Sequence, residues 1–515
     1  MKNISQDEFI FEGFMETTKH YEDPVGEVTV WAEFILPSGR TVKYPAFWDG
    51  NNTWRVRGEC LETGVWQYRI SSSDTSNLDF HGRPGAFEVK ESPQNIPLLC
   101  RGGLRVAKDG FHLEHVDGTP FFYLADTAWN GILKSEPADW EHYLSVRKEQ
   151  GFTAVQCVLT HWRSFPVNVQ GETAFTGTES IAINPRFFQQ LDEKVAVINR
   201  HGLVAALVLL WACTDKDIGY YLPEADAVKL ARYMVARYGA YQVIWMLGGD
   251  GDYRCEKANR WKRIARAVFE GNHTRLVTMH PGGQHWVADE FRDETWFDFI
   301  SYQSGHGDNC DHLRWLVEKH PAEEWKKTPS RPIINQEPNY EAHSAYHSRE
   351  VFDAYKVRRA LYWSLLVAPT AGVTYGHHGI WPWTEERGVP LDHPGTGESP
   401  TWHESLHSEG AISVTHLKEF FGNLEWWSLR PAPELLKEQP GANDPAKFIT
   451  IARAEDSSFA VAYLPIGGVI SLCCGEWQPS ECRWYDPRTG RWLNRIKFST
   501  RLVAPDNQDW VLWVG

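Results

Sequence analysis

Residues 184–213 read NPRFFQQLDEKVAVINRHGLVAALVLLWAC, a helix pattern that runs directly into a strand pattern. Asn184 and Pro185 are helix start signals, and the apolar side chains that follow recur with the period of an α-helix as far as Gly202, a stop signal. The run 204–210 is apolar throughout and has the length of a buried strand. The stretch therefore predicts one helix–strand unit of an α/β domain.

The same alternation of strand and helix recurs between about residue 99 and residue 430. Ser135 and Pro137 open a second helical segment, which ends before Gly151. Eight apolar strand candidates follow one another along this part of the chain: Phe121–Ala125, Ala154–Leu159, Val204–Leu210, Val243–Leu247, Leu276–Met279, Phe299–Tyr302, Ile333–Asn335 and Val373–Tyr375. This number and spacing predict a (β/α)₈ barrel with insertions. A doubly wound open sheet is the competing fold, but the chain has no GxGxxG or GxxxxGK[ST] loop for nucleotide phosphates.

The two ends of the chain have a different pattern, that of β-domains. In residues 1–98, apolar residues alternate with polar ones at 28–34 and again at 66–70, which predicts a small β-sandwich. Residues 91–95 read as a linker into the barrel at 99–430. Residues 431–515 return to short strand candidates, with a turn at 486–490, and are expected to form a second small β-domain.

Composition and charge exclude several classes of protein. Hydrophobic residues make up 42% and charged residues 23%, as in a folded globular protein. The net charge is −15, which repels phosphate backbones and anionic lipid heads, so neither nucleic acid nor a membrane is expected as a partner. The 25 Trp residues offer flat apolar faces of the kind on which sugar rings stack.

The chain has no features of a secreted or membrane-spanning protein. Its first residues, MKNISQDEFIFEGF, lack the basic and apolar regions of a secretory signal. The longest apolar run, 204–213, is too short to cross a bilayer. The nine cysteines are scattered and form no CxxC pair, so a cytoplasmic protein with reduced thiols is predicted. The sequence leaves open whether the chain forms a homo-oligomer.

The residues that leave the predicted strand ends are polar and aromatic. In a (β/α)₈ barrel these ends form the active-site face. Two carboxylates among them, Asp250 and Glu337, are the candidate catalytic groups. The candidate substrate-binding residues are Asp126, Trp129, His161, Trp211, His280, Tyr302, Gln303, His306, Tyr375, His377 and Trp381. Carboxylates with imidazoles and indoles suit glycoside hydrolysis, in which one carboxyl protonates the leaving oxygen and the other stabilises or attacks the anomeric carbon.

Each of these residues also has a structural interpretation. Asp250 could cap the following helix, as Asp at a strand end often does. Asp126 could be a structural partner within the barrel. Each His taken alone is more often a hydrogen-bonded structural residue than a ligand. Only the repeated placement of these residues at strand ends favours a binding site.

The order of segments resembles the bacterial apiosidase-like glycoside hydrolases. The matching stretches are FFYLADTAWN (Phe121–Asn130), VIWMLGGD (Val243–Asp250), TMHPGG (Thr278–Gly283), SYQSGH (Ser301–His306), INQEPNY (Ile334–Tyr340) and VTYGHHGIW (Val373–Trp381). The resemblance implies a β-sandwich, a (β/α)₈ catalytic barrel and a small C-terminal β-domain. It also implies that Asp250 is the acid/base and Glu337 the nucleophile, with neither metal nor cofactor.

Two departures from related barrels bear on the substrate. Gly249-Asp250 stands where the wider clan usually has Asn-Glu, and Asn335-Gln336 precedes the nucleophile where Asp-Gly is frequent. Family members that act on plant polysaccharide are typically exported, whereas this chain shows no export signal. A small imported glycoside or oligosaccharide is therefore the expected substrate, with apiose or a related furanose or pyranose as the sugar.

Two alternatives remain beside the glycosidase. His403 to His407 match HExxH, which on a helix would place two histidines on one face for zinc, with Glu404 as the base of a peptidase. The position for the third His holds Ser413, so this reading is weak. The second alternative is a carbohydrate-binding protein without catalysis.

Overall fold

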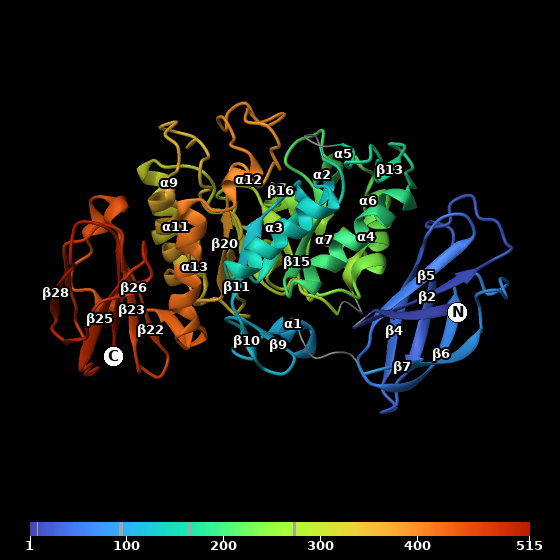
Figure 1. Cartoon of the computed structure of the whole chain (residues 1–515), viewed down its shortest axis with the longest axis horizontal. Helices are drawn as coiled ribbons and strands as arrows, with labels where there is room; N and C mark the ends of the chain where they lie inside the picture. Colours follow the sequence, from blue (N-terminus) through green and yellow to red (C-terminus); the bar gives the residue numbers. More distant parts are fainter. Residues whose placement is uncertain (8, 92–95, 163–165, 271–273) are drawn as a thin grey trace.

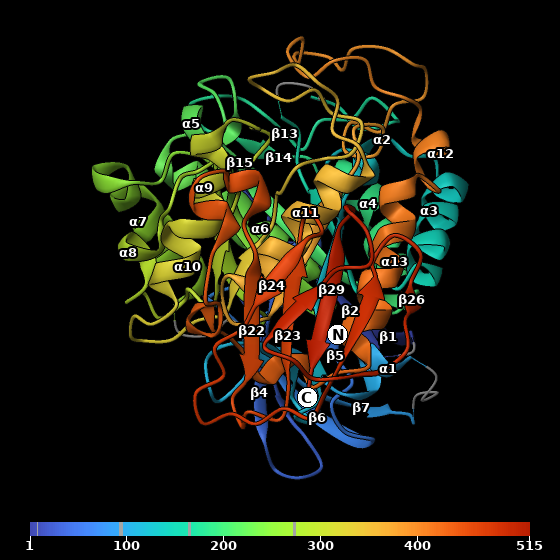
Figure 2. The same ribbon diagram turned by 90° about the vertical axis from the view of Figure 1, so that its left-hand side faces the viewer.

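The computed structural model of the protein describes residues 1–7, 9–91, 96–162, 166–270 and 274–515. Three parts lie in a row, with an N-terminal β-domain and a C-terminal β-domain on opposite sides of a central barrel (Figure 1; Figure 2). Residues 92–95 of the predicted linker fall outside the described residues. No helix within the described ranges has the length and apolar character that a membrane span requires.

The N-terminal part is one antiparallel sheet in the order β1-β2-β5-β4-β3-β6-β7. Its strands are β1 Lys2–Asp7, β2 Ile10–Glu16, β3 Val30–Ile35, β4 Thr41–Trp48, β5 Thr53–Glu59, β6 Gly64–Ser72 and β7 Pro84–Val89. Burial alternates along β3 and β6, as the sequence pattern predicts. The sheet folds over itself, because the rings of Phe11 in β2 and Phe87 in β7 lie 5.0 Å apart although their strands are distant in the sheet order. This is the expected sandwich.

The central part is a parallel eight-stranded barrel, which confirms the predicted fold class. Its strands run in the order β17-β16-β15-β12-β11-β20-β19-β18. Their bounds are β11 Tyr123–Thr127, β12 Ala154–Val158, β15 Val204–Trp211, β16 Val243–Gly251, β17 Val277–Pro281, β18 Ile300–Tyr302, β19 Ile333–Asn335 and β20 Gly372–Gly376. The barrel closes between β17 and β18, where the Thr278 hydroxyl donates to the carbonyl of Phe299 at 2.7 Å.

Helices surround the barrel strands. They are α2 Gly131–Lys134, α3 Pro137–Glu149, α4 Pro185–Arg200, α5 Ile218–Tyr221, α6 Glu224–Tyr238, α7 Ala258–Phe269, α8 Ala288–Phe291, α9 Cys310–Glu318, α10 His320–Glu324, α11 Ala354–Leu366, α12 Trp402–Ser405 and α13 Glu409–Gly422. The two helices predicted from start and stop signals are α3 and α4. The side chain of Asn184 caps α4 by accepting from the backbone N–H of Arg186.

A short segment covers the end of the barrel at which the strands begin. It consists of α1 Pro97–Cys100, β8 Leu104–Val106, β9 Leu113–His115 and β10 Pro120–Phe121. Its apolar side chains join the cluster inside the barrel, where Leu113 and Phe121 pack with Tyr123 and Phe299. A pair of short antiparallel strands, β13 Phe175–Thr176 and β14 Ala182–Ile183, lies between β12 and α4 in the chain. Access to the interior is therefore left at the C-terminal ends of the strands, here called the mouth.

The C-terminal part is antiparallel, in the order β21-β22-β23-β29-β25-β26, with β27 beside β25 and a separate β24–β28 pair. Its strands are β21 Leu429–Pro431, β22 Thr450–Ala454, β23 Ala460–Leu464, β24 Val469–Ser471, β25 Glu481–Asp486, β26 Arg491–Trp492, β27 Ile496–Lys497, β28 Arg501–Val503 and β29 Trp510–Val514. Arg358 of α11 pairs with the buried Asp509 at 2.7 Å, which anchors this domain to the barrel.

Candidate active site

Glu337 lies at the mouth, directly after β19. The side-chain oxygen of Asn335, the last residue of that strand, accepts the backbone N–H of Glu337 at 3.3 Å. The carboxylate accepts a hydrogen bond from Nε2 of His280 at 3.1 Å and another from Nε2 of His306 at 3.0 Å. A carboxylate can only accept, so both Nε2 atoms carry hydrogen. Each oxygen of Glu337 therefore has its own imidazole donor.

These two donors set the charge of Glu337. The side chain is only 9% exposed, and burial by itself would raise the pKa of the carboxyl. The hydrogen bonds from His280 and His306 act in the opposite direction and hold the pKa below its ordinary value of 4.5. Glu337 is consequently a buried carboxylate that stays ionised at neutral pH.

A polar network inside the barrel supports the chain below Glu337. The Gln336 side chain donates to the hydroxyl of Tyr123 at 3.1 Å and accepts from the hydroxyl of Ser301. Its backbone carbonyl accepts from the side chain of Gln156 at 3.0 Å. These groups come from four strands or strand ends, so the point from which Glu337 leaves the barrel is fixed.

Several buried polar atoms around Glu337 have no hydrogen-bond partner among the described residues. They are Nδ1 of His280 and His306, Nε1 of Trp211 and the hydroxyl of Tyr340. A buried donor or acceptor without a partner costs about 1–3 kcal/mol. Such a concentration at one place is typical of a site that is completed by water or by a ligand with many hydroxyls.

Four indoles form a continuous aromatic wall beside this carboxylate. Trp129 lies 5.0 Å from the ring of His280 and 5.4 Å from Trp211. Trp162 lies 4.7 Å from Trp211 and 6.3 Å from Trp381. These rings come from the ends of four different segments of the barrel, so the mouth has one apolar side and one polar side.

Asp250 occupies a β-bulge at the end of β16. In the pairing with β17, Gly249 lies opposite His280 and Gly251 opposite Pro281, which leaves Asp250 as the extra residue. Its backbone φ is +53°, in the left-handed region that few residues other than glycine adopt. Bulges next to active sites re-aim a side chain, and backbone strain of this kind persists where the surroundings enforce it.

The bulge brings Asp250 into the neighbourhood of Glu337. Asp250 follows Gly249, whose register partner His280 donates to Glu337. The pKa of the Tyr346 hydroxyl is affected by both carboxylates, and the side chain of this residue is 49% exposed. The protein around its hydroxyl and then the negative charges of Glu337 and Asp250 raise the pKa of Tyr346. The two predicted catalytic residues therefore act on one common side chain.

Three predicted substrate-binding residues point away from the mouth, which corrects the expectation for each. Asp126 accepts from Arg147 at 2.6 Å and from Tyr143 at 2.7 Å, both on α3. Tyr302 packs against Trp315 of α9, with ring centroids 5.9 Å apart. Tyr375 donates to Glu341 at 2.5 Å and contacts Ser408. The reason is strand parity, because alternate residues of a barrel strand face the helices rather than the interior.

Three others lie at the edge of the site. The Nδ1 atom of His377 accepts the backbone N–H of Gly379 at 3.0 Å, so this imidazole stabilises a turn. Burial lowers the pKa of His161 to about 4, and its ring lies 4.7 Å from Phe175 in β13. Gln303 is buried beside Gly283. A Cβ atom placed on this glycine would lie 3.3 Å from the amide oxygen of Gln303.

The structure also adds residues to the mouth that the candidate set lacks. The ring of His306 lies 4.4 Å from Tyr340 and 4.3 Å from His343. Tyr346 belongs to the same group, 5.5 Å from His306. All three follow Glu337 in the chain, within NQEPNYEAHSAY. Their closeness in sequence to INQEPNY is a signal that could have identified them, but they lie beyond the end of β19, and the prediction considered only strand ends.

The HExxH segment does not form the helical face that a zinc site would need. Helix α12 ends at Ser405, so His403 and His407 do not share one helix. Glu404 instead closes the N-terminus of α12 through a capping box with Thr401 and pairs with Arg387 at 2.7 Å. Within the described part of the chain no group of three or more His, Cys, Asp or Glu side chains is placed to hold a metal ion.

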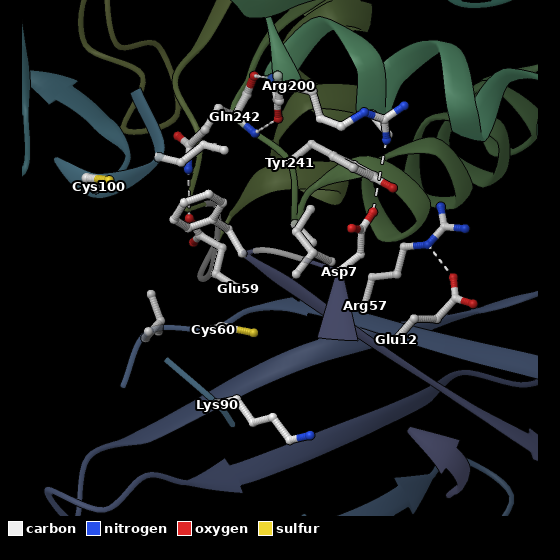
Figure 3. Close-up of a pocket in the computed structure, with 18 of the residues that line it drawn as sticks. Asp7, Glu12, Arg57, Glu59, Cys60, Lys90, Cys100, Arg200, Tyr241 and Gln242 are labelled. Carbon is white, nitrogen blue, oxygen red and sulfur yellow. Dashed lines mark hydrogen bonds and ion pairs between the residues drawn. The ribbon is translucent and has the colours of Figure 1, made fainter. Parts of the chain in front are cut away.

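A cavity of about 530 Å³ lies between the sandwich and the barrel (Figure 3). Its wall includes 240–242, which directly precede β16, whereas Asp250 is at the other end of that strand, about 25 Å away at 3.3 Å per residue. Charged groups in its wall already pair with protein, as Glu59 does with Arg275 at 2.7 Å. This cavity belongs to the interface between the domains and not to the mouth.

Comparison with known proteins agrees with this geometry. Residues 107–428 match the family model "Apiosidase-like, catalytic domain", residues 8–73 match "Domain of unknown function (DUF5060)", and residues 431–515 match "Putative collagen-binding domain of a collagenase". No curated protein sequence matches the chain.

Solved structures share the fold. A protein described as a glycoside hydrolase is 23% identical, with a TM-score of 0.70 over 81% of this chain and 97% of its own. A glycoside hydrolase family 5 protein from Bacteroides vulgatus ATCC 8482 is 22% identical, with a TM-score of 0.70 over 81% of this chain and 94% of its own. Another structure from that strain has a TM-score of 0.71 at 18% identity and covers 98% of both chains. With more than half of its length matched by the family model, this chain belongs to the apiosidase-like family of glycoside hydrolase-like catalytic domains.

Proposed function

We propose that the protein is a retaining glycoside hydrolase that removes a terminal sugar, apiose or a related furanose or pyranose, from a small plant-derived glycoside or oligosaccharide. The observation that carries the proposal is Glu337, a buried and ionised carboxylate held by His280 and His306 beside an indole wall. Keeping a buried carboxylate charged is costly in a purely structural role, but an ionised carboxylate is what a nucleophile requires.

In the first step, Glu337 attacks the anomeric carbon. A bond forms between the carboxylate oxygen and that carbon while the bond to the leaving oxygen breaks. Asp250 gives its proton to the leaving oxygen, so the aglycone departs as a neutral alcohol and Asp250 becomes a carboxylate. The products of this step are the free alcohol and a covalent glycosyl-enzyme.

In the second step, Asp250 acts as base. It takes a proton from a water molecule, whose oxygen attacks the anomeric carbon from the side that the aglycone left. The bond to Glu337 breaks, the carboxylate is restored and Asp250 is again protonated. Two inversions give a sugar with the original anomeric configuration.

The rest of the mouth would bind and orient the sugar. The imidazole nitrogens and the indole N–H that lack protein partners can meet hydroxyl groups, and the indole faces can meet the C–H surface of a ring. His280 and His306 contact Glu337 directly, so we assign them the additional task of holding the nucleophile.

The test is a panel of aryl glycosides that includes β-apiosides, α-L-arabinofuranosides and β-galactosides. The proposal expects turnover of at least one member, lost in Glu337→Ala and, for members with poor leaving groups, strongly reduced in Asp250→Ala. A non-catalytic carbohydrate-binding protein would instead bind a sugar in calorimetry without turning over any member of the panel. Turnover that survives in both variants would overturn the assignment of the two carboxylates.

A further inference from the structure

The bulge that carries Asp250 rests on Tyr253, a residue that the mechanism above does not use. Tyr253 is fully buried just beyond β16, with its ring 4.9 Å from Trp261 of α7 in an edge-on arrangement. An added Cβ on Gly248 would come to 2.6 Å from the Tyr253 hydroxyl, and one on Gly251 to 2.5 Å. The phenol thus fills the hollow that these two glycines leave on either side of Asp250.

This packing explains how a left-handed residue is held at the strand end. A φ of +53° costs a non-glycine residue free energy, and it persists only where neighbouring groups prevent relaxation. On one side, Gly249 packs against the ring of Trp211, because its added Cβ would come to 2.5 Å from that indole. On the other side, Tyr253 closes the space. The backbone of Asp250 is therefore clamped between two aromatic rings.

The hydroxyl of Tyr253 has no hydrogen-bond partner among the described residues although it is fully buried. Burial, and after it the negative charge of Asp250, hold the pKa of this hydroxyl well above its ordinary value of 10.0. It therefore keeps its proton at neutral pH. A buried hydroxyl that keeps its proton and has no other partner is available to donate to a carboxylate that comes within hydrogen-bond reach.

We propose that Tyr253 is the positioning residue of Asp250: its ring fixes the bulge that aims the carboxyl, and its hydroxyl is the donor that this carboxyl meets when it is ionised. This proposal rests on the assignment of Asp250 as acid/base. The phenol would stabilise the carboxylate formed when Asp250 gives its proton to the leaving oxygen, so it favours the departure of poor leaving groups.

Tyr253→Phe removes the hydroxyl and keeps the ring. The matched control is Tyr302→Phe, because Tyr302 is equally buried and its hydroxyl also lacks a partner among the described residues, but it faces α9 rather than Asp250. In Tyr253→Phe, kcat/KM for glycosides with poor leaving groups should fall roughly two- to tenfold, the worth of one hydrogen bond. Activated aryl glycosides should be less affected, and Tyr302→Phe should behave as the unaltered protein.

A second variant and a second measurement keep the proposal falsifiable without turnover. Tyr253→Leu should increase the loss for poor leaving groups, and its thermal unfolding shows whether the fold is retained. In protein carrying carbon-13 in its Asp carboxyl groups, with the Asp250 signal assigned from Asp250→Asn, NMR titration should give a higher pKa for Asp250 in Tyr253→Phe and an unchanged one in Tyr302→Phe. Loss of a donor to the ionised form raises a pKa.

Three outcomes separate the two proposals. An Asp250 pKa that is the same in Tyr253→Phe and in Tyr302→Phe overturns the role of Tyr253, whatever the enzyme hydrolyses. Equal losses on poor and activated leaving groups in Tyr253→Leu overturn it as well. Failure of the unaltered protein to hydrolyse any glycoside would overturn the proposed function and leave the NMR titration to decide the role of Tyr253.

Discussion

Arg147 donates from Nε to the carboxylate of Asp126 at 2.6 Å, and neither side chain is exposed to solvent. The pair joins the end of β11 to α3, in the layer between the barrel and its helices. Nη1 of this guanidinium donates to the carbonyl oxygen of Leu406 at 2.9 Å and to the side-chain oxygen of Gln150 at 2.6 Å. A charged residue at a strand end, which resembles a site residue in the sequence, is here part of the scaffold.

Asp126→Ala should therefore destabilise the protein. It leaves a buried guanidinium without its carboxylate, and breaking a buried pair from one side costs about 3–5 kcal/mol. Urea unfolding followed by circular dichroism would measure the loss. Asp289→Ala is the control, since Asp289 pairs with Lys327 in an exposed position and should change stability little. A variant at Asp126 that is fully stable but no longer binds sugar would contradict the structural role.

Asp250→Asn should slow the enzyme according to the leaving group. Protonation of the departing oxygen helps poor leaving groups and is unnecessary for good ones. The loss in kcat should therefore be large for alkyl glycosides and small for dinitrophenyl glycosides, measured over a series of leaving groups. Equal losses across the series would remove Asp250 from the acid role.

Glu337→Ala should abolish turnover and leave folding intact. Added azide should restore cleavage of an activated glycoside and give a glycosyl azide of inverted configuration, because azide enters from the face that Glu337 occupied. NMR of the first product identifies the configuration. The retaining mechanism also expects the carboxyl groups of Asp250 and Glu337 to lie about 5–5.5 Å apart, against about 6.5–9.5 Å for an inverting enzyme. An inverted first product from the unaltered protein would contradict the nucleophile.

His280→Leu and His306→Leu should each shift the acid limb of the pH profile. The donors from these residues hold the pKa of Glu337 below its ordinary value, while burial acts in the opposite direction. With one donor removed the pKa rises, so kcat/KM should begin to fall at a higher pH as the solution is acidified. His343→Leu is the control, because that imidazole contacts His306 and is absent from the hydrogen bonds to Glu337. An acid limb that stays in place in both variants would exclude this role.

Turnover should survive EDTA and the substitution Glu404→Gln. The reason is the short helix α12, in which Glu404 serves the capping box and the pair with Arg387. The measurement is the rate on an aryl glycoside after dialysis against EDTA, with and without added zinc. Activity that falls and returns with zinc would revive the zinc peptidase reading.

Much of the fold follows from local patterns in the sequence. The predicted strand 204–210 is β15 Val204–Trp211, and the helix signals at Asn184 and Gly202 bracket α4. A helix period, a strand period and a start signal each involve residues within a few positions of one another, so a single sequence displays them. The eight strand candidates all became barrel strands for the same reason.

It was harder to predict which strand-end side chains face the barrel interior and which face the helices, although the alternation of side chains along a strand is a signal for this. Successive residues of a strand face opposite sides. In β11 the inward side chain of Tyr123 puts Ala125 and Thr127 on the interior side and Asp126 on the helix side. Every second residue from an inward-facing apolar residue also faces inward. Applied to each strand, this rule would have excluded Asp126, Tyr302 and Tyr375 from the mouth. Strand ends that twist or bulge, as at Asp250, break this count.

What the sequence by itself determined is the barrel, its flanking β-domains and the two carboxylates at strand ends. Only the tertiary structure decided that Glu337 is held by His280, 57 residues away, and by His306, 31 residues away. It alone also decided that Asp250 is the extra residue of a bulge. The physical reason is that periodicity is a local property of the chain, whereas contacts between strand ends arise from the closure of the barrel, which joins segments that no short pattern relates.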